Sequence, residues 1–491
     1  MIRLLNESQK MNPRTRMYSL RLLTAAAALL LTAPAFAAET EVQVPSAGSA
    51  ELTIYTNDLA MVRERRTFRL TGSPTHLAIT GVSNQLQPQT AFLSVIKGNA
   101  VKITEQSFNF DLLSPQKLLE RAIGQTVTIV NQNPATGADL GTRAKVLSVQ
   151  GGLVLDVNGK IVTGMPGRIV YDALPPGVRS TPTLLMTVTG APNQDVDAEL
   201  GYLTGGLSWH PDYVMQYDPD AARMDLSALA TITNTAGQDF RDAKVKLVAG
   251  AVKRITPQPI PMTRAPMAAK AMMMESSAMA DGVGEEALVG NHVYSIPKTT
   301  TIAASESKQL ALLNAQSVGV KRDFVVRGDQ SLYFMSIKDR PQELNAEIEL
   351  TFKNDAASKL GTPLPAGTVR IYSPDEQGAP QFVGEAALDH IPVGEDAVVK
   401  MGRDYDISGA RVQTTYVRAT DTISLSNWKI VLKNAKGKPV TVHVIEPMAG
   451  TWEITKENLT HKKLDSGSVV WDVQIPAKGQ AVLDYSVKTQ S

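Results

Sequence analysis

The chain lacks cysteine altogether and lacks an excess of charge of either sign. None of its 491 residues is cysteine, so disulfide bonds, a thiol nucleophile and a lipid attached through cysteine are all excluded. The 49 basic residues are balanced by 48 acidic ones, and the formal net charge is +1. A balance so close to zero provides no electrostatic footprint for nucleic acid or for an anionic membrane surface. We therefore expect no nucleic-acid partner.

The short motifs of common catalytic and metal sites are also missing. The histidines lie far apart in the sequence, so there is no HxH or HExxH pair. The segment 206–210 reads Gly-Leu-Ser-Trp-His and lacks the closing glycine of a nucleophile elbow. Paired aspartates such as Asp404 and Asp406 lack the spacing of a calcium loop, and the segment 152–160 lacks that of a phosphate loop. We predict no catalytic residue and no cofactor.

Long hydrophobic runs are scarce, and the clearest one lies near the N-terminus at residues 22–31. It is too short to cross a bilayer, which takes roughly 20 apolar residues. It follows Arg14, Arg16 and Arg21 and precedes Ala-Phe-Ala at 35–37. This order is typical of a secretory signal peptide, so we expect cleavage near Ala37, export to the periplasm or beyond, and no transmembrane segment in the mature chain.

What the sequence contains in abundance is short strands. Segments such as 52–55, 126–130 and 184–188 are β-branched or alternating and are bounded by Gly, Pro or Asn. They predict an all-β protein made of several antiparallel β-sandwich modules. One short helix is expected at 114–123, with Ser114 as its N-cap and Pro115 in its first position.

Glycines divide the segment that follows the start of this helix into strands of only a few residues. This spacing suits a small, strongly bent barrel of the SH3-like type. Asn158-Gly159 separates two apolar runs and predicts a two-residue hairpin turn.

Three further strands are expected to end at an asparagine, namely Asn234, Asn354 and Asn434. The residues two, four and six places before each asparagine are apolar, which puts them on a core face. They are Ile232, Ala230 and Ala228, then Phe352, Leu350 and Ile348, then Leu432, Ile430 and Trp428. Duplication and convergent turn chemistry both account for this pattern.

Between about 256 and 291 the strand pattern gives way to proline, alanine and methionine, which indicates a flexible insertion. Its adjacent Met272, Met273 and Met274 are weak candidates for binding Cu(I) or for absorbing oxidants, since thioethers are soft ligands and oxidise reversibly. They lack a regular Met-x-x-Met spacing, so a disordered insertion or a partner-contact loop is the favoured interpretation.

Taken together, these signals predict the following organisation. The segments are a signal peptide at 1–37, an N-terminal β domain at 38–111, the SH3-like module at 112–179, a β-sandwich domain at 180–315 that carries the insertion 256–291, and one or more C-terminal β-sandwich domains at 316–491.

One cluster of side chains is a candidate binding surface. Trp209, His210 and Tyr213 lie beside Gly205-Gly206 and could form a stacking platform for a glycan. The favoured interpretation is instead that Trp209 anchors a sandwich core, as large aromatic side chains usually do.

Several ordered blocks resemble a known bacterial family. They are Gly206-Leu207-Ser208-Trp209 with Tyr213, Asn234 with Asp239-Phe240, Leu247 to Gly250, Leu364 to Gly367 with Arg370-Ile371-Tyr372, Phe382 to Glu385, and His390 to Glu395. From about residue 180 to the C-terminus the chain resembles the domain of unknown function 4139 family, some of whose members are labelled mucoidy-inhibitor-like. The resemblance implies a β scaffold and an envelope location, and it brings no established reaction.

The sequence therefore favours an exported, multidomain β protein with a non-enzymatic binding or structural role in the cell envelope, where its partner is a protein or a polysaccharide. Two alternatives remain open at this stage. One is a hydrolase or modifying enzyme that acts on an envelope polymer through a site assembled from distant residues, and the other is copper or oxidant handling by the methionine-rich segment.

Overall fold

The computed structural model describes residues 41–46, 48–109, 112–164, 167–174, 178–250, 252, 284–288, 291–337, 340–448 and 450–490. These residues are mainly strands in five sheets, joined by one α-helix and two short 3₁₀ helices, which confirms the predicted all-β class. No helix in this part of the chain is long and apolar enough to span a membrane. The predicted signal peptide at 1–37 and Met272, Met273 and Met274 lie outside the described residues.

Two N-terminal sheets pack on one hydrophobic core. The four-stranded sheet has the order β1 (Val42–Val44), β4 (Thr75–Thr80), β12 (Thr183–Thr189), β6 (Lys102–Asn109). The larger sheet has the order β17 (Gly284–Leu288), β18 (Asn291–Ser295), β16 (Phe240–Ala249), β2 (Ala50–Tyr55), β3 (Ala60–Leu70), β13 (Gln194–Thr204), β5 (Phe92–Lys97). Strand β19 (Thr300–Ile302) also pairs with β16, and the 3₁₀ helix η1 (Pro88–Thr90) precedes β5. Because β3 pairs with β13 and β2 pairs in parallel with β16, sequence from before and after the small unit shares this core.

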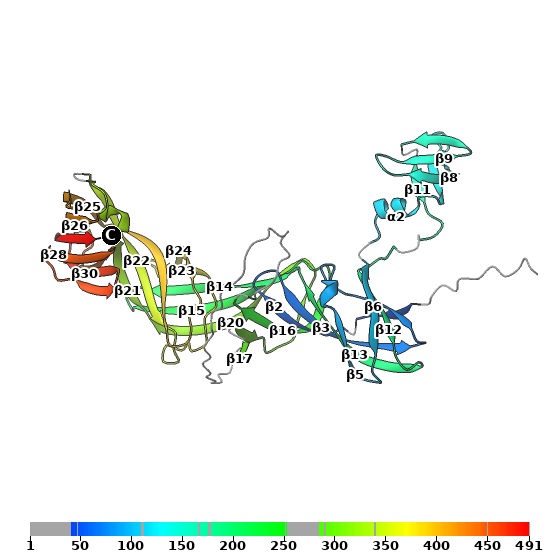
Figure 1. Ribbon diagram of the computed structural model, residues 1–491, viewed down its shortest axis with the longest axis horizontal. Helices are drawn as coiled ribbons and strands as arrows, with labels where there is room; N and C mark the ends of the chain where they lie inside the picture. The colour runs from blue at the N-terminus through cyan, green and yellow to red at the C-terminus, as the bar shows by residue number, and fades with distance from the viewer. Residues whose placement is uncertain are drawn as a thin grey trace, which may run out of the picture.

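The small unit contains the only α-helix among the described residues, α2 (Pro115–Arg121), and a five-stranded sheet. The sheet has the order β10 (Lys160–Thr163), β9 (Val154–Val157), β8 (Asp139–Ser148), β7 (Thr126–Gln132), β11 (Arg168–Val170). The predicted helix start is confirmed, since the Ser114 side chain accepts the Lys117 N–H at 3.1 Å. The predicted hairpin is confirmed as well, because β9 and β10 pair across Asn158 and Gly159, whose φ angles are +53° and +79°. Figure 1 shows this unit standing apart beside β6 and β12.

The rest of the described chain forms two more sheets. The five-stranded one has the order β20 (Glu306–Gly319), β15 (Arg223–Asn234), β14 (Leu207–Asp218), β23 (Gly367–Pro374), β24 (Pro380–Leu388). The nine-stranded one has the order β28 (Thr451–Glu457), β31 (Gln480–Gln490), β26 (Ile423–Asn434), β25 (Asp396–Arg418), β22 (Gln342–Lys353), β21 (Lys321–Arg327), β27 (Val440–Pro447), β30 (Ser468–Ile475), β29 (Lys462–Asp465), with η2 (Gln330–Tyr333) between β21 and β22.

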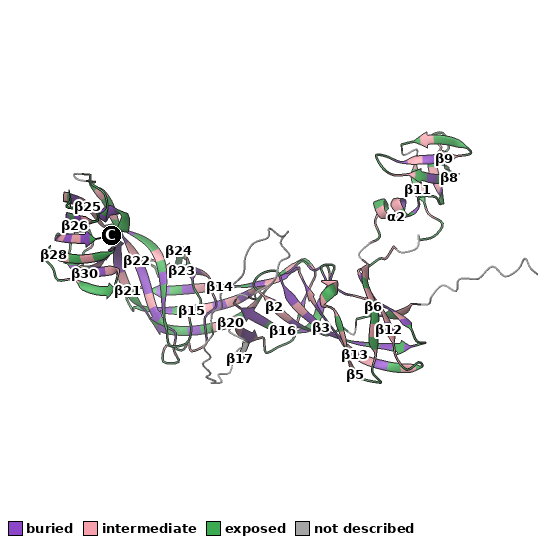
Figure 2. Cartoon of the chain, in the orientation of Figure 1, coloured by how far each residue is buried: buried purple, intermediate pink, exposed green. Residues whose placement is uncertain are grey.

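Long strands pass from one hydrophobic core into the next. On β14, Trp209 belongs to the N-terminal core and Met215 to a second core between the five-stranded and nine-stranded sheets. On β22, Leu350 belongs to that second core and Ala346 to a third core within the nine-stranded sheet. Figure 2 shows purple buried positions on strands throughout the elongated body. Continuous strands, each hydrogen-bonded to its neighbours, therefore connect the three cores directly.

The three predicted asparagine strands are β15, β22 and β26; β15 and β26 end at their asparagine, and β22 ends one residue before Asn354. The apolar positions before Asn234 and Asn434 are buried, and before Asn354 two are buried while Ile348 is partly buried. The interleaved Lys429 and Lys433 are exposed, so period-two alternation is confirmed.

Each of these buried asparagines uses both ends of its amide to fix a turn. The Nδ2 atom of Asn434 lies 2.9, 3.5 and 3.1 Å from the carbonyl oxygens of Lys438, Ile475 and Pro476, and its Oδ1 accepts the Lys436 N–H at 2.9 Å. The carbonyls around the other two amides are those of Gln238, Ile302 and Ala303 for Asn234, and of Thr362, Ile391 and Pro392 for Asn354. In all three cases, an asparagine side chain thus joins the end of a strand to a distant loop.

Candidate functional site

The predicted surface at Trp209, His210 and Tyr213 lies on β14, where the alternation of the strand separates its members. Trp209 is buried, donates its Nε1–H to the carbonyl of Val248 at 3.0 Å, and packs edge-on against Tyr294. Tyr213 is buried and donates its hydroxyl to the carbonyl of Pro365 at 2.7 Å. A glycan can stack only on exposed rings, and the structure places both of these rings in a core. His210 points the other way, with its side chain 61% exposed.

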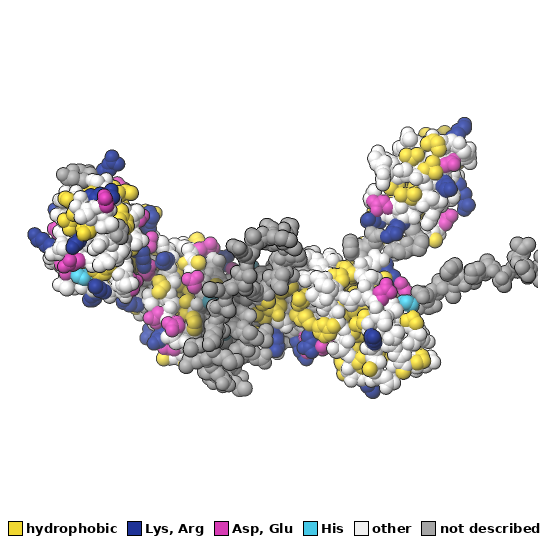
Figure 3. All heavy atoms as spheres, viewed as in Figure 1, with side chains coloured by type: hydrophobic (Ala, Val, Ile, Leu, Met, Phe, Trp, Pro, Cys, Tyr) yellow, Lys and Arg dark blue, Asp and Glu magenta, His cyan; other side chains and the backbone are white. Residues whose placement is uncertain are grey.

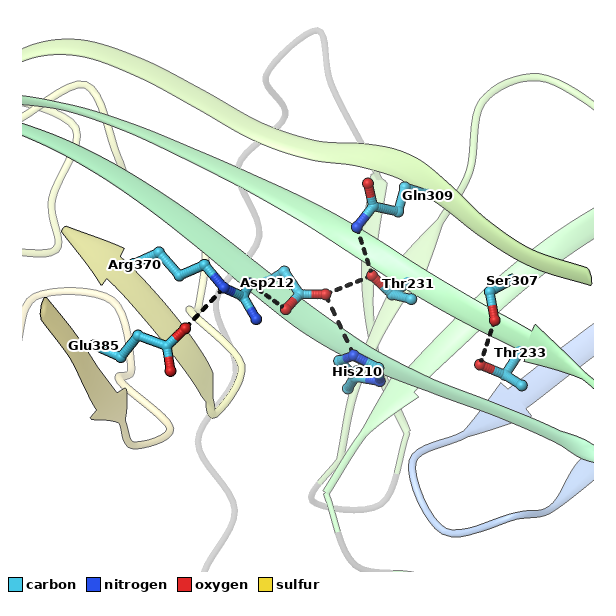
Figure 4. A network of polar contacts seen from close by, with 8 residues as sticks. All are labelled: His210, Asp212, Thr231, Thr233, Ser307, Gln309, Arg370 and Glu385. Carbon is cyan, nitrogen blue, oxygen red and sulfur yellow. Dashed lines mark hydrogen bonds and ion pairs between the residues drawn. The ribbon is translucent and has the colours of Figure 1, made fainter. Parts of the chain in front are cut away.

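Beside His210, one polar side chain from every strand of the five-stranded sheet joins a continuous row. We call this row the polar belt, and Figure 4 shows it on the face of the sheet that carries His210. Its members, in strand order, are Gln309, Thr231, Asp212, Arg370 and Glu385. The strand register places them together: Thr231 is paired with Gln309 and with His210, and Arg370 is paired with Glu385.

The belt is held by hydrogen bonds and ion pairs along its whole length. Gln309 donates to the Thr231 hydroxyl at 3.1 Å, and Thr231 donates to Asp212 Oδ2. Arg370 donates from Nη1 to Asp212 Oδ1 at 2.8 Å and from Nε to Glu385 at 3.0 Å. His210 Nε2 lies 3.3 Å from Asp212 Oδ2. All the belt side chains are therefore preorganised.

Asp212 is the electrostatic centre of the belt, with only 12% of its side chain exposed. Burial alone would raise its pKa, but the hydrogen bonds from Thr231 and Arg370 outweigh burial, and the pKa of Asp212 is lowered. Asp212 in turn raises the pKa of Arg370 through their hydrogen bond. A general acid must hold a proton at neutral pH, and Asp212 is instead stabilised as a carboxylate. The belt thus offers fixed charges and hydrogen-bonding groups.

We predict that Asp212→Asn lowers the free energy of unfolding by about 1–2 kcal/mol at pH 7, because the charge-assisted bond from Arg370 is lost. Since the pKa of Asp212 is lowered on folding, its contribution is present above the unfolded pKa of about 4 and is lost as the pH falls through the folded pKa. Urea unfolding should therefore show a difference between variant and wild type that shrinks from pH 7 towards pH 3. The matched control is Glu385→Gln, which removes a carboxylate that is half exposed and should change stability by less than about 0.5 kcal/mol. A deficit for Asp212→Asn that is equal at both pH values would contradict the role given to its charge.

A second polar cluster is enclosed within the nine-stranded sheet, and we call it the buried tetrad. It consists of Arg411, Glu446, Tyr333 and Tyr485, all almost completely buried. Arg411 forms an ion pair with Glu446 Oε1, Tyr333 donates to Glu446 Oε2 at 2.8 Å, and the two tyrosine hydroxyls lie 2.8 Å apart. This cluster lies in the third core and has no exposed member, so its contribution is to stability.

Sequence reasoning identified His210 and missed the remainder of both clusters. The signal for the belt was present in part, because Arg370 and Glu385 fall within the blocks that carry the family resemblance. The tetrad gave no local signal, since Glu446 is 113 residues from Tyr333 and 35 from Arg411.

The paired aspartates of the sequence are held in ion pairs or turns, and Asp404 and Asp406 both pair with Lys436. Asp195 and Asp197 pair with Arg69 and Arg65 on the neighbouring strand. Asp218 accepts backbone N–H groups of its own turn. Within the described part of the chain, no three His, Asp or Glu side chains converge in a way that could hold a metal ion.

Comparison with known proteins places this region in a family. A model of the family described as domain of unknown function DUF4139 matches residues 198–490. The match begins within β13 and includes every strand that contributes to the polar belt and to the buried tetrad. No curated protein matches the chain.

Proposed function

The chain belongs to the DUF4139 family, and from this premise and the polar belt we propose that it is an exported component of the cell envelope that acts by binding another envelope component. The observation that carries the proposal is the belt itself, a preorganised row of polar groups that crosses all five strands of one sheet. Its partner is an envelope protein or polysaccharide that contacts His210, Arg370 and Glu385.

The belt's geometry supports binding because its groups are already oriented before a partner arrives. The largely buried Asp212 orients Arg370 and His210 through its contacts with both. Arg370 and Glu385 keep 39% and 51% of their side chains exposed. Preorganised groups lose little conformational freedom on binding, so their hydrogen bonds contribute more to affinity. A flat face with alternating donors and acceptors suits a polar partner.

Export is the second half of the proposal and is supported by the sequence of the N-terminal segment. A basic stretch, a short apolar run and a small-residue site occur in the order that signal peptidases require. The absence of cysteine is compatible with an oxidising compartment, because no thiol can be oxidised there.

The small unit with α2 is proposed as an SH3-like barrel that supplies a separate contact surface. Its short antiparallel strands surround a core of its own, which includes Val146 and Leu155. An experimental structure of this unit that lacks barrel closure would refute the assignment.

The proposal predicts a site-specific crosslink in intact cells. A photoreactive amino acid placed at His210 should yield a covalent adduct with an envelope protein or glycan, detected by a shift in mobility and identified by mass spectrometry and glycan staining. The matched control carries the same amino acid at Tyr405, which is 92% exposed on β25 and lies outside the belt. The same adducts from both positions, or none from His210, would contradict a binding role for the belt.

A further inference from the structure

A groove beside the starts of two inner strands of the nine-stranded sheet contains two cations that form no ion pair with an acidic side chain of the described chain. It lies where the parallel strands β21 and β27 both begin, next to the turn between β26 and β27. Its volume is about 620 Å³, within the range of small-ligand sites. The side chains that matter are Arg322, Lys438, Lys436, His443 and Asp323.

Four of these five side chains are basic, and they differ in whether an acidic side chain forms an ion pair with them. Lys436 is neutralised by Asp404 and Asp406, at 2.9 and 3.2 Å. Asp323, the one acidic group of the set, is paired with Lys321 at 2.8 Å.

The other two cations, Arg322 and Lys438, line the groove, are exposed and have no acidic partner within ion-pair distance among the described residues. Arg322 is oriented by the ring of Phe324, which lies 5.4 Å from its guanidinium carbon. The groove therefore presents two uncompensated cations to whatever enters it.

The wall that carries Lys438 is fixed by one of the buried asparagines. Asn434 accepts the Lys436 N–H and donates to the Lys438 carbonyl, both at 2.9 Å. The Lys436 carbonyl also accepts the Lys478 N–H at 3.0 Å. A turn tied at three points holds the backbone of Lys438 in place, so a ligand would not have to order this turn.

Strand β27, which follows this turn, carries a histidine fixed between two carboxylates. His443 Nδ1 lies 2.8 Å from Asp472 and its Nε2 lies 3.3 Å from Asp323, so both ring nitrogens are already engaged within the protein. Thr441, on the same strand, also lines the groove and adds a hydroxyl. The ligand's charge must therefore be met by Arg322 and Lys438.

We propose that this groove binds an anionic group, a carboxylate or a phosphate, through charge-assisted hydrogen bonds from Arg322 and Lys438. A guanidinium suits either group because it can donate two parallel bonds, and the lysine adds a point charge. The site is separate from the polar belt, and its occupation does not depend on the function proposed for the belt.

The test is calorimetric titration of the full mature chain with three probes: inorganic phosphate, a uronic-acid disaccharide and its neutral counterpart. We expect phosphate or the uronic acid, or both, to bind and the neutral sugar not to bind. Affinity should fall as salt is added, because surface charges are screened. Binding of phosphate alone identifies a phosphate ligand, and binding of the uronic acid alone identifies a carboxylated sugar.

The decisive variant is Arg322→Gln with Lys438→Gln, which should weaken anion binding at least about tenfold, equivalent to 1.4 kcal/mol. Its matched control is Lys400→Gln with Lys429→Gln, two exposed lysines outside the groove that give the same change in net charge. Lys438→Gln alone provides a milder variant if the double variant unfolds early. The proposal is overturned if neither anion binds, or if the groove variant and the control lose affinity equally.

Discussion

Replacing Glu446 by glutamine is expected to lower the free energy of unfolding of the nine-stranded sheet by about 3–5 kcal/mol. The substitution preserves the shape of the side chain and removes its charge, so no cavity accompanies it. It leaves the guanidinium of Arg411, of which 2% is exposed, without its counter-ion. An uncompensated charge in a core is among the most costly defects a protein can carry.

The surroundings of Glu446 explain why the loss is large. Burial raises the pKa of Glu446, and the charge of Arg411 with the hydroxyl of Tyr333 opposes that rise. Both carboxylate oxygens accept hydrogen bonds, one from Arg411 and the other from Tyr333. Arg411 and Glu446 are only 2% and 1% exposed, so bulk water cannot solvate the guanidinium once the carboxylate charge is removed.

Urea unfolding followed by tryptophan fluorescence is the appropriate measurement. Trp428 packs edge-on against Tyr333, with ring centroids 5.6 Å apart, and Trp471 stacks on Tyr485 at 4.6 Å. Both indoles therefore report on the core that contains the buried tetrad. Because the chain has several cores that can unfold separately, the unfolding transition reported by these tryptophans must be fitted separately from the others.

The matched control is Asp421→Asn, in the ion pair that Asp421 forms with Arg418 at 3.8 Å on the surface of the same sheet. An exposed pair contributes about 0–1 kcal/mol, so this variant should unfold almost as the wild type does. The double replacement Arg411→Met with Glu446→Leu should recover much of the loss, since two apolar side chains leave no buried charge. Equal effects of Glu446→Gln and Asp421→Asn would show that the buried pair is not specially stabilising.

The parts of this fold that could be predicted are those encoded by neighbouring residues. The cap at Ser114 and the turn at Asn158-Gly159 involve contacts within three residues, and both were found. The alternation before Asn434 also extends over a few residues, because successive side chains of a strand face opposite sides. Local chemistry of this kind is visible in one sequence.

What could not be predicted depends on which strands become neighbours. The polar belt exists because β14 pairs in parallel with β23, and this brings Asp212 to Arg370 across 158 residues. The same limit applies at Trp209: the sequence favoured a core position for its ring, but the sheets that pack on it come from elsewhere in the chain and could not be identified. Long-range parallel pairing leaves no spacing pattern in the sequence.

The second large effect is expected from Asn434→Asp, which should lower the free energy of unfolding by about 2–4 kcal/mol at pH 7. The amide of Asn434 is buried and faces the carbonyl oxygens of Lys438 and Pro476. A carboxylate in its place has no hydrogen to donate, so it would leave these carbonyls unpaired and repel them; each buried unpaired group costs about 1–3 kcal/mol.

This variant should also gain a pH dependence whose sign is opposite to that of Asp212. Burial beside carbonyl oxygens would raise the pKa of the new aspartate, and its protonated form can still donate one hydrogen bond. Because the folded pKa is then higher than the unfolded pKa of about 4, stability is retained below that value and lost as the pH rises through the folded pKa. Urea unfolding at pH 4 and pH 7 should show the larger deficit at pH 7.

The control for this pair of measurements is Asn427→Asp, the same substitution at an exposed position of the same strand. It should change stability by no more than about 0.5 kcal/mol at either pH, since a surface carboxylate remains hydrated. If Asn434→Asp matched it, the turn would be held by backbone bonds alone and the shared amide contacts of Asn234, Asn354 and Asn434 would be incidental to stability. If instead Asn434→Asp also weakened anion binding in the neighbouring groove, the amide would be shown to fix the turn that carries Lys438.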